Sequence, residues 1–160
     1  MFSIYLKKTD QCTSRELSDF KNTLLNRSDI NKENLDQRIL RAKFLAFYYL
    51  ESRLIGIGAI KSATPGFRNR ILAGQVIQLV ADLPESEIGW FYIHDNFRGK
   101  GIGSYILSEL LKVSLYNHLF AVTSSENREM RHLLTNNNFS FSGEIKLNEE
   151  KNYFLYFRNE

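Results

Sequence analysis

FRGKGIGSYIL, residues 97–107, is the stretch that decides how the rest of the sequence is interpreted. Its first seven residues hold three glycines and two cations, and the sequence then turns apolar at helical spacing. The first N–H groups of a helix have no intrahelical acceptor, and the helix dipole makes them favour an anion. Glycines allow an anion to approach the backbone closely. The stretch therefore predicts a phosphate-binding turn that opens a helix.

The spacing of the glycines excludes two familiar phosphate loops. A G-x-x-x-x-G-K-[ST] loop does not occur. A G-x-G-x-x-G fingerprint fails because Ile106 or Ser104 stands where the last glycine is required. The pattern that fits is R-x-x-G-x-G, formed by Arg98, Gly101 and Gly103.

Hydrophobic periodicity predicts a chain in which strands and helices are mixed. Thr13 and Glu16 form a capping-box signature for the first helix, and a run of asparagines after residue 135 is typical of a helix end. Residues 62–86 are compatible with a helix or with irregular structure. We expect strands over 2–6, 43–50, 53–61, 87–94, 118–123, 139–147 and 152–158, and helices over 14–27, from about Asn31 to residue 40, from 102 to about Tyr116, and over 125–137.

With the strand 87–94 in front of it, the R-x-x-G-x-G pattern resembles the pyrophosphate signature [RQ]-x-x-G-x-[GA] of the GCN5-related N-acetyltransferase (GNAT) family. Residues 127–139 also resemble that family's N-x-x-A-x-x-L-Y-x-x-x-G-F element. The element order agrees along nearly the whole chain. The resemblance implies an α/β (α+β) protein with the acyl-CoA N-acyltransferase fold, which has a mixed central sheet of about seven strands and helices on both faces. We expect a single such domain over residues 1–160.

The resemblance implies direct transfer of an acetyl group from acetyl-CoA to an amine. Glu87, at the start of the central strand, is the residue that matches a catalytic glutamate of several members, and it would act as the general base. In the family a main-chain N–H of this strand, often near a bulge, binds the thioester oxygen, and the matching donors here are the N–H groups of Tyr92 and Ile93. The residues expected to contact the coenzyme are Tyr92, Ile93, Arg98, Gly99, Lys100, Gly101, Ile102, Gly103, Ser104 and Asn127.

Leu134 departs from the family pattern, because many members carry there a tyrosine that hydrogen-bonds the departing sulfur. A non-catalytic acyl-CoA-binding regulatory module is therefore the alternative to an enzyme, and an interaction protein that keeps only the fold is a third hypothesis. Asn127 has a simpler interpretation as a helix cap, and Glu87 as a residue at a strand end in water. Tyr105 and Tyr116 are expected to pack, although either could replace the missing tyrosine.

Composition narrows the functional class further. The net charge of +3 is too small and too scattered for a nucleic-acid-binding protein. The single cysteine, Cys12, excludes an intrachain disulfide and a multi-cysteine metal site, so we expect no metal. Without a signal-peptide-like start or an apolar run of membrane-spanning length, we expect a cytoplasmic protein that does not bind membranes. The acceptor, a small-molecule or peptide amine, is not encoded in any motif, and exposed aromatics in 153–157 could support a homodimer.

Overall fold

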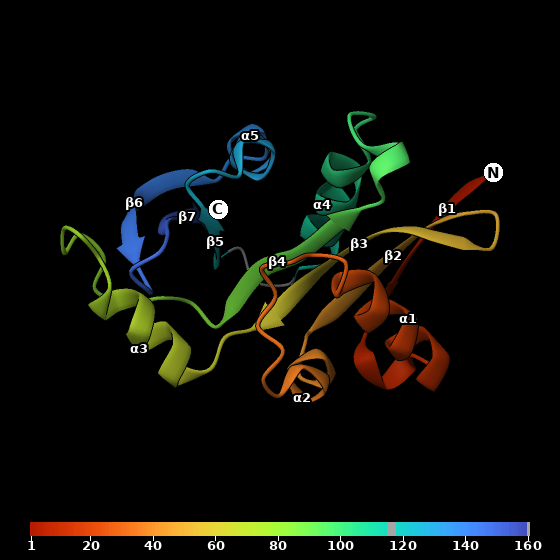
Figure 1. Cartoon of the computed structure of the whole chain (residues 1–160), viewed down its shortest axis with the longest axis horizontal. Helices are drawn as coiled ribbons and strands as arrows, with labels where there is room; N and C mark the ends of the chain where they lie inside the picture. Colours follow the sequence, from red (N-terminus) through yellow and green to blue (C-terminus); the bar gives the residue numbers. More distant parts are fainter. Residues whose placement is uncertain (115–117, 160) are drawn as a thin grey trace. The chain divides into compact units, whose positions relative to one another are not determined.

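A computed structural model describes residues 1–114 and 118–159 (Figure 1). Seven strands form one mixed sheet in the order β1-β2-β3-β4-β5-β7-β6. The elements, in chain order, are β1 (Phe2–Lys7), α1 (Ser14–Leu24), α2 (Leu35–Leu40), β2 (Phe44–Leu50), β3 (Arg53–Ser62), α3 (Pro65–Ala73), β4 (Ser86–Ile93), α4 (Ile102–Val113), β5 (His118–Ser124), α5 (Arg128–Asn136), β6 (Ser140–Lys146) and β7 (Asn152–Asn159). This architecture confirms the predicted fold class.

All the predicted strands are present, and the differences concern helices. Residues 62–86 contain the helix α3, whose N-cap Thr64 accepts a hydrogen bond from the Phe67 backbone. The first helix is capped by the Thr13–Glu16 box as predicted but ends at Leu24. The second begins at Leu35, after a left-handed Asn34, so the cap predicted near Asn31 was wrong. The predicted end of the helix at Tyr116 lies outside the described residues.

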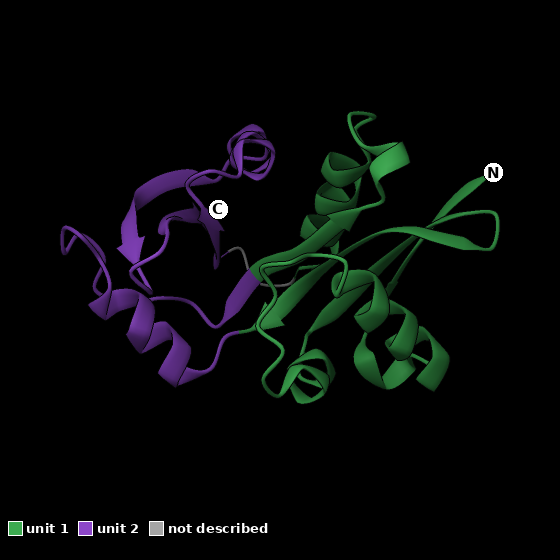
Figure 2. Ribbon diagram, in the orientation of Figure 1, with its two compact units in different colours: residues 1–62, 88–114 green, residues 63–87, 115–160 purple. Residues whose placement is uncertain are grey.

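The chain divides into two compact units, each made of two separate segments (Figure 2). Unit 1 comprises residues 1–62 and 88–114, and unit 2 comprises residues 63–87 and 115–160. Strand β4 contributes its first two residues to unit 2 and the remainder to unit 1. The expectation of one domain over residues 1–160 stays a prediction.

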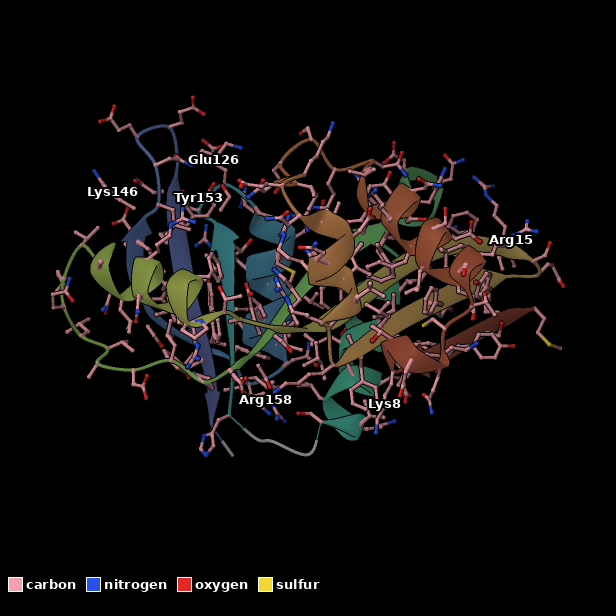
Figure 3. The ribbon with its side chains drawn as sticks, turned by 90° about the horizontal axis from the view of Figure 1, so that it is seen from below. Lys8, Arg15, Glu126, Lys146, Tyr153 and Arg158 are labelled. Atoms are coloured by element: carbon pink, nitrogen blue, oxygen red, sulfur yellow. The ribbon has the colours of Figure 1, made fainter. Side chains whose placement is uncertain are left out.

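In unit 1, one face of the strands is covered by α1 and α2. The strands β1 and β2 pair antiparallel, as do β2 and β3. The core on this face joins both helices to alternate strand residues: Phe20, Leu24, Leu35, Ile39, Leu45, Phe47, Ile57, Ala59 and Trp90. The outer side of α1 is polar, and Arg15 projects from it into solvent with a side-chain exposure of 91% (Figure 3).

The opposite face of unit 1 packs against α4, and two glycines make this close approach possible. A Cβ on Gly58 would lie 2.9 Å from both Ile106 Cγ2 and Phe91 Cε1, and one on Gly56 would lie 3.0 Å from Ile93 Cδ1. Since real Cβ atoms essentially never come within 3.0 Å, a side chain at Gly58 would force Ile106 of α4 or Phe91 to shift, and one at Gly56 would be a tight fit. Helices therefore cover both faces of the sheet, as predicted.

Unit 2 has its own core, which α3 contributes to. Strand β7 pairs antiparallel with both β5 and β6, and β4 pairs parallel with β5 through Glu87 and Phe120. The buried residues of this core are Ala63, Ile71, Leu83, Phe120, Ile145 and Leu155. The segment after α3 is fastened to β6 by two backbone hydrogen bonds, from Val76 to Glu144 and from Lys146 to Gly74.

The aromatic side chains of β7 are buried or half-buried, so the exposure expected of them was wrong, while a homodimer stays a prediction. Tyr153 and Phe157 pack against the core of unit 2, and Tyr156 is 4% exposed. Phe154 packs edge-on against Phe141 of β6. Among the described residues, no helix is both long and apolar enough to cross a membrane.

Candidate functional site

The predicted phosphate-binding turn lies at the N-terminus of α4 in unit 1. A short 3-10 turn over Asp95–Phe97 follows β4, and the chain then passes through two left-handed glycines, Gly99 with φ +75° and Gly101 with φ +80°. An added Cβ would meet nothing within 4 Å at either glycine. The space beside this backbone is therefore open, as an approaching anion requires.

The helix end itself offers unsatisfied donors. Gly101 is the N-cap of α4, and no side chain in the described part of the chain caps it. The first backbone N–H groups of α4, which begin at Ile102, have no acceptor within the helix. The Ile102 side chain is buried, so only its backbone can contact a ligand, whereas Ser104 is exposed. Tyr105 packs edge-on against Tyr48.

The two cations of the turn are arranged differently. Arg98 folds back onto β4: its Nε donates to the Ile93 carbonyl at 2.8 Å, its Nη2 pairs with Asp95 at 3.1 Å, and its guanidinium lies 5.2 Å from the centre of the Tyr92 ring. Lys100 is exposed, with its Nζ 5.8 Å from the centre of the Phe97 ring. Arg98 thus anchors the turn to the strand, and Lys100 presents its charge to solvent.

A further cation from the β2–β3 hairpin reaches the same turn. The Arg53 guanidinium lies 5.9 Å from the centre of the Phe97 ring, on which Lys100 also rests, and its Nη2 is 3.1 Å from His94 Nε2. Arg53 was not predicted as part of this region, because its contact with His94 joins residues 41 apart. Together these side chains make the surroundings of the turn basic.

Strand β4 is bulged before it reaches the turn. Trp90 has φ +58°, a left-handed conformation that a bulky residue rarely adopts. The Ala63 N–H donates to the Glu85 carbonyl, and the His94 N–H donates to the Ile55 carbonyl. From Glu85 to His94 the chain advances by nine residues along β4, whereas from Ile55 to Ala63 it advances by eight along β3. Strand β4 therefore carries one extra residue, which is a bulge. A bulge near the N–H groups of Tyr92 and Ile93 agrees with what the resemblance to the GNAT family implies for this strand.

The direction of the backbone after the bulge distinguishes Tyr92 from Ile93, the two residues whose N–H groups are expected to bind the thioester oxygen. Because the His94 N–H points toward β3, the alternation of a strand directs the Tyr92 N–H toward β3 as well, and the Ile93 N–H toward the opposite edge. On that opposite edge the Phe91 carbonyl accepts a hydrogen bond from Arg27 Nη1 at 3.3 Å. Ile93 is therefore the better-placed donor of the two.

Glu87 belongs to unit 2 and is buried, with 4% of its surface exposed. The alternative interpretation, a residue at a strand end in water, was therefore wrong. Glu87 pairs with Phe120 of β5 in the sheet, which fixes its backbone. Glu85, a second carboxylate directly before β4, is exposed.

Asn127 and Leu134, also in unit 2, both belong to α5 and its cap. Asn127 is the N-cap, and its Oδ1 accepts a hydrogen bond from the Met130 N–H at 3.1 Å. The capping interpretation is therefore confirmed, while a contact with a coenzyme through the Asn127 amide stays a prediction. Leu134 is completely buried, so it packs as an ordinary core residue.

Two further features of unit 1 lie outside the predicted site residues. Burial raises the pKa of the Cys12 thiol, which makes it a poor nucleophile.

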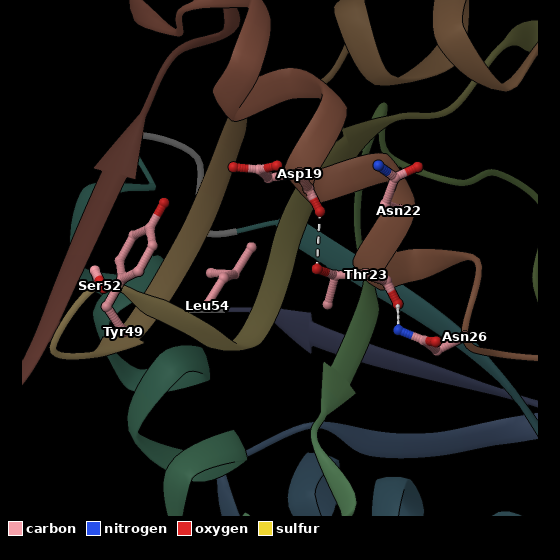
Figure 4. Close-up of a pocket in the computed structure, with 7 residues that line it drawn as sticks. All are labelled: Asp19, Asn22, Thr23, Asn26, Tyr49, Ser52 and Leu54. Atoms are coloured by element: carbon pink, nitrogen blue, oxygen red, sulfur yellow. Dashed lines mark hydrogen bonds between the residues drawn. The ribbon is translucent and has the colours of Figure 1, made fainter.

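A pocket of about 310 Å³ is lined by Asp19, Asn22, Thr23, Asn26, Tyr49, Ser52 and Leu54 (Figure 4). The pKa of Tyr49 is raised, first by burial and then by the nearby carboxylates of Glu16 and Asp19. The pocket thus offers polar groups in a negative surrounding.

Comparison with known proteins agrees with this geometry. The sequence model of the acetyltransferase (GNAT) family matches residues 11–139, which include segments of both units. The chain belongs to this family. GNAT enzymes are acetyltransferases that take acetyl-CoA as cosubstrate. No curated protein sequence matches the chain.

Solved GNAT-like structures share the fold over nearly their whole length. ElaA from Escherichia coli has a TM-score of 0.72 and 10% identity, and covers 99% of this chain and 100% of its own. A GNAT acetyltransferase from Streptococcus agalactiae has a TM-score of 0.68 and 14% identity, covering 98% and 95%. The protein yncA from Salmonella typhimurium, solved with its cofactor acetyl-CoA, has a TM-score of 0.63 and 15% identity, covering 99% and 93%. At these identities the likeness establishes the fold.

Proposed function

We propose that this GNAT protein transfers an acetyl group from acetyl-CoA to the amine of a small molecule or peptide. Family membership, together with the open left-handed turn at the start of α4, carries the proposal. We further propose that residues 1–160 act as a single catalytic domain.

The residues of the turn fit a pyrophosphate. Gly99 and Gly101 leave room beside the backbone, and the first N–H groups of α4 supply donors with the positive end of the helix dipole behind them. Lys100 is exposed and adds a cation, whereas Arg98 contributes by holding the turn in place. Gly103 and Ser104, in the first turn of the helix, complete the set.

The coenzyme supplies the acetyl group as an activated thioester. We propose that the Ile93 N–H hydrogen-bonds the thioester oxygen, where negative charge develops during attack. Tyr92 would support this strand through its ring contact with Arg98. Asn127 would contact the coenzyme through the amide hydrogens that its capping bond leaves available.

The proton of the acceptor has to leave before a new bond can form. An ammonium has no lone pair, so we propose that Glu87 takes the proton, directly or through water. The amine nitrogen then bonds to the acetyl carbon, the carbon–sulfur bond breaks, and the thiolate that leaves takes up a proton. Leu134 carries no proton to give, so that proton would come from solvent or from another group.

The buried Leu134 favours one alternative, a module that binds acyl-CoA without catalysis. Calorimetric titration with acetyl-CoA tests binding, and release of CoA thiol in the presence of amino acids, polyamines, aminoglycosides and peptide N-termini tests transfer. Binding with thiol release on one class of amine supports the enzyme. Binding without release on any of them supports the module, and absence of binding refutes both.

A further inference from the structure

Two arginines flank the Ile93 N–H on the edge of β4 that faces away from β3. Two backbone carbonyls on this edge, at Phe91 and Ile93, lie on either side of that N–H. Arg27 Nη1 donates to the Phe91 carbonyl at 3.3 Å, and Arg98 Nε donates to the Ile93 carbonyl at 2.8 Å. Both carbonyl oxygens thus already accept a hydrogen bond from an arginine, and the group that lies between them on this edge is the Ile93 N–H donor.

The Arg27 side chain is held in a fixed orientation by the Asp29 carboxylate. Arg27 follows α1 in the chain, and its Nε and Nη2 form a two-point contact with the Asp29 carboxylate at 2.9 and 2.7 Å. Its side chain is 27% exposed, whereas that of Arg15 in α1 is 91% exposed. A planar guanidinium with three engaged nitrogens has little freedom to turn, so its third nitrogen is aimed at the Phe91 carbonyl.

The contact between Arg27 and the Phe91 carbonyl lies next to the part of β4 that is proposed to bind the thioester. Phe91 directly follows Trp90, whose left-handed backbone bends the strand, so the Arg27 bond holds the strand where it leaves the bulge. An exposed carbonyl oxygen beside the Ile93 N–H would repel negative charge developing there. The paired Asp29 offsets much of the Arg27 charge, so masking the oxygen is the larger effect.

We propose, on the basis of the function proposed above, that Arg27 is a positioning residue for acetyl transfer. It fixes the bulged part of β4 and masks the Phe91 carbonyl, so that the Ile93 N–H can polarise the thioester carbonyl. Arg27 does not touch the acetyl group itself.

The test uses acetyl-CoA labelled with ¹³C at the thioester carbonyl, because the chemical shift of this carbon reports its polarisation and needs no acceptor. In the wild-type protein the bound signal moves to higher chemical shift than in free acetyl-CoA. In Arg27→Met, which keeps the apolar stem, we expect at least half of that displacement to disappear. Arg15→Met is the matched control and should keep it. With an accepted amine, kcat of Arg27→Met should fall about tenfold, less than for loss of a direct donor, with KM within about twofold.

A general structural defect gives a different result. CoA with a free thiol has no carbonyl, so its dissociation constant should stay within about twofold in Arg27→Met. Arg27→Lys keeps a cation and is expected to restore part of the change in the carbonyl chemical shift. If circular dichroism shows that Arg27→Met does not fold, the chemical shift in Arg27→Lys is the result that tests the proposal. An unchanged carbonyl signal in the variants, or equal weakening of CoA and acetyl-CoA, refutes the role of Arg27 alone. Failure of the wild type to bind acetyl-CoA refutes the proposed function as well.

Discussion

Replacing Gly101 with alanine tests the central feature of the site, the left-handed turn that opens α4. Gly101 has φ +80°, and a Cβ there would meet nothing within 4 Å, so the cost of alanine is purely that of the backbone conformation. That cost is about 1–2 kcal/mol for an ordinary L-residue. For a chain of this size, each kcal/mol lowers the melting temperature by about 2–4 °C.

The same substitution should weaken coenzyme binding for a separate reason. The open space beside Gly101 is where a pyrophosphate would approach, and a methyl group placed there costs about one charge-assisted hydrogen bond, or roughly tenfold in the dissociation constant. Gly101→Asn separates the two effects, because asparagine tolerates the left-handed region better but carries the same Cβ. We expect Gly101→Asn to recover part of the stability and none of the affinity.

Thermal unfolding and calorimetric titration with acetyl-CoA measure the two quantities. Gly66→Ala is the control, since Gly66 lies in α3, has open space around its Cβ and should become slightly more stable as alanine. A Gly101→Ala protein that melts within 1 °C of the wild type and binds acetyl-CoA equally well would show that this turn has neither the conformation nor the role assigned to it.

Three other substitutions test separate parts of the molecule. Gly58→Ala should destabilise the protein by about 1–3 kcal/mol, measured by urea unfolding, because its Cβ would collide with α4; a smaller loss would mean that α4 packs more loosely. Glu87→Gln should lower kcat and flatten its pH profile, and unchanged values would remove Glu87 from its role. Hydrogen bonds from Lys7 and, to a smaller extent, from the Thr13 N–H lower the pKa of Glu16. The ionised Glu16 side chain therefore stabilises the fold fully above the ordinary carboxyl pKa, and this stabilisation is lost as the pH falls through the lowered pKa of the folded protein. The stability difference between wild type and Glu16→Gln should therefore shrink between pH 7 and acid, and a constant difference would contradict this.

Features set by residues close together in the sequence were predictable. The cap of α1 depends on Thr13 and Glu16, three residues apart, and both of its hydrogen bonds are present. The asparagine run after α5 predicted a left-handed residue, and Asn138 has φ +67°. The turn at Gly99 and Gly101 was predictable for the same reason, because glycine is the residue that adopts positive φ at little cost.

Features set by distant residues were not predictable. Arg27 and the Phe91 carbonyl are 64 residues apart, and nothing near either of them signals the contact. Trp90 stands in a run of strand-forming residues, so its left-handed backbone contradicts its own propensity. The aromatics of β7 were expected to be exposed, but Phe141 of β6 covers Phe154 while Tyr153 packs against the core.

The division of the chain into interleaved segments also bears on how the protein is made. During synthesis, unit 1 lacks its last segment until residue 114 has left the ribosome, while residues 63–87 emerge earlier and must wait for 115–160. The nascent chain therefore carries Ile71 and Leu83 of the unit 2 core before Phe120, Ile145 and Leu155, which complete that core, have been made. A stop codon after residue 62 would release a fragment without β4 and α4, and we expect such a fragment to aggregate.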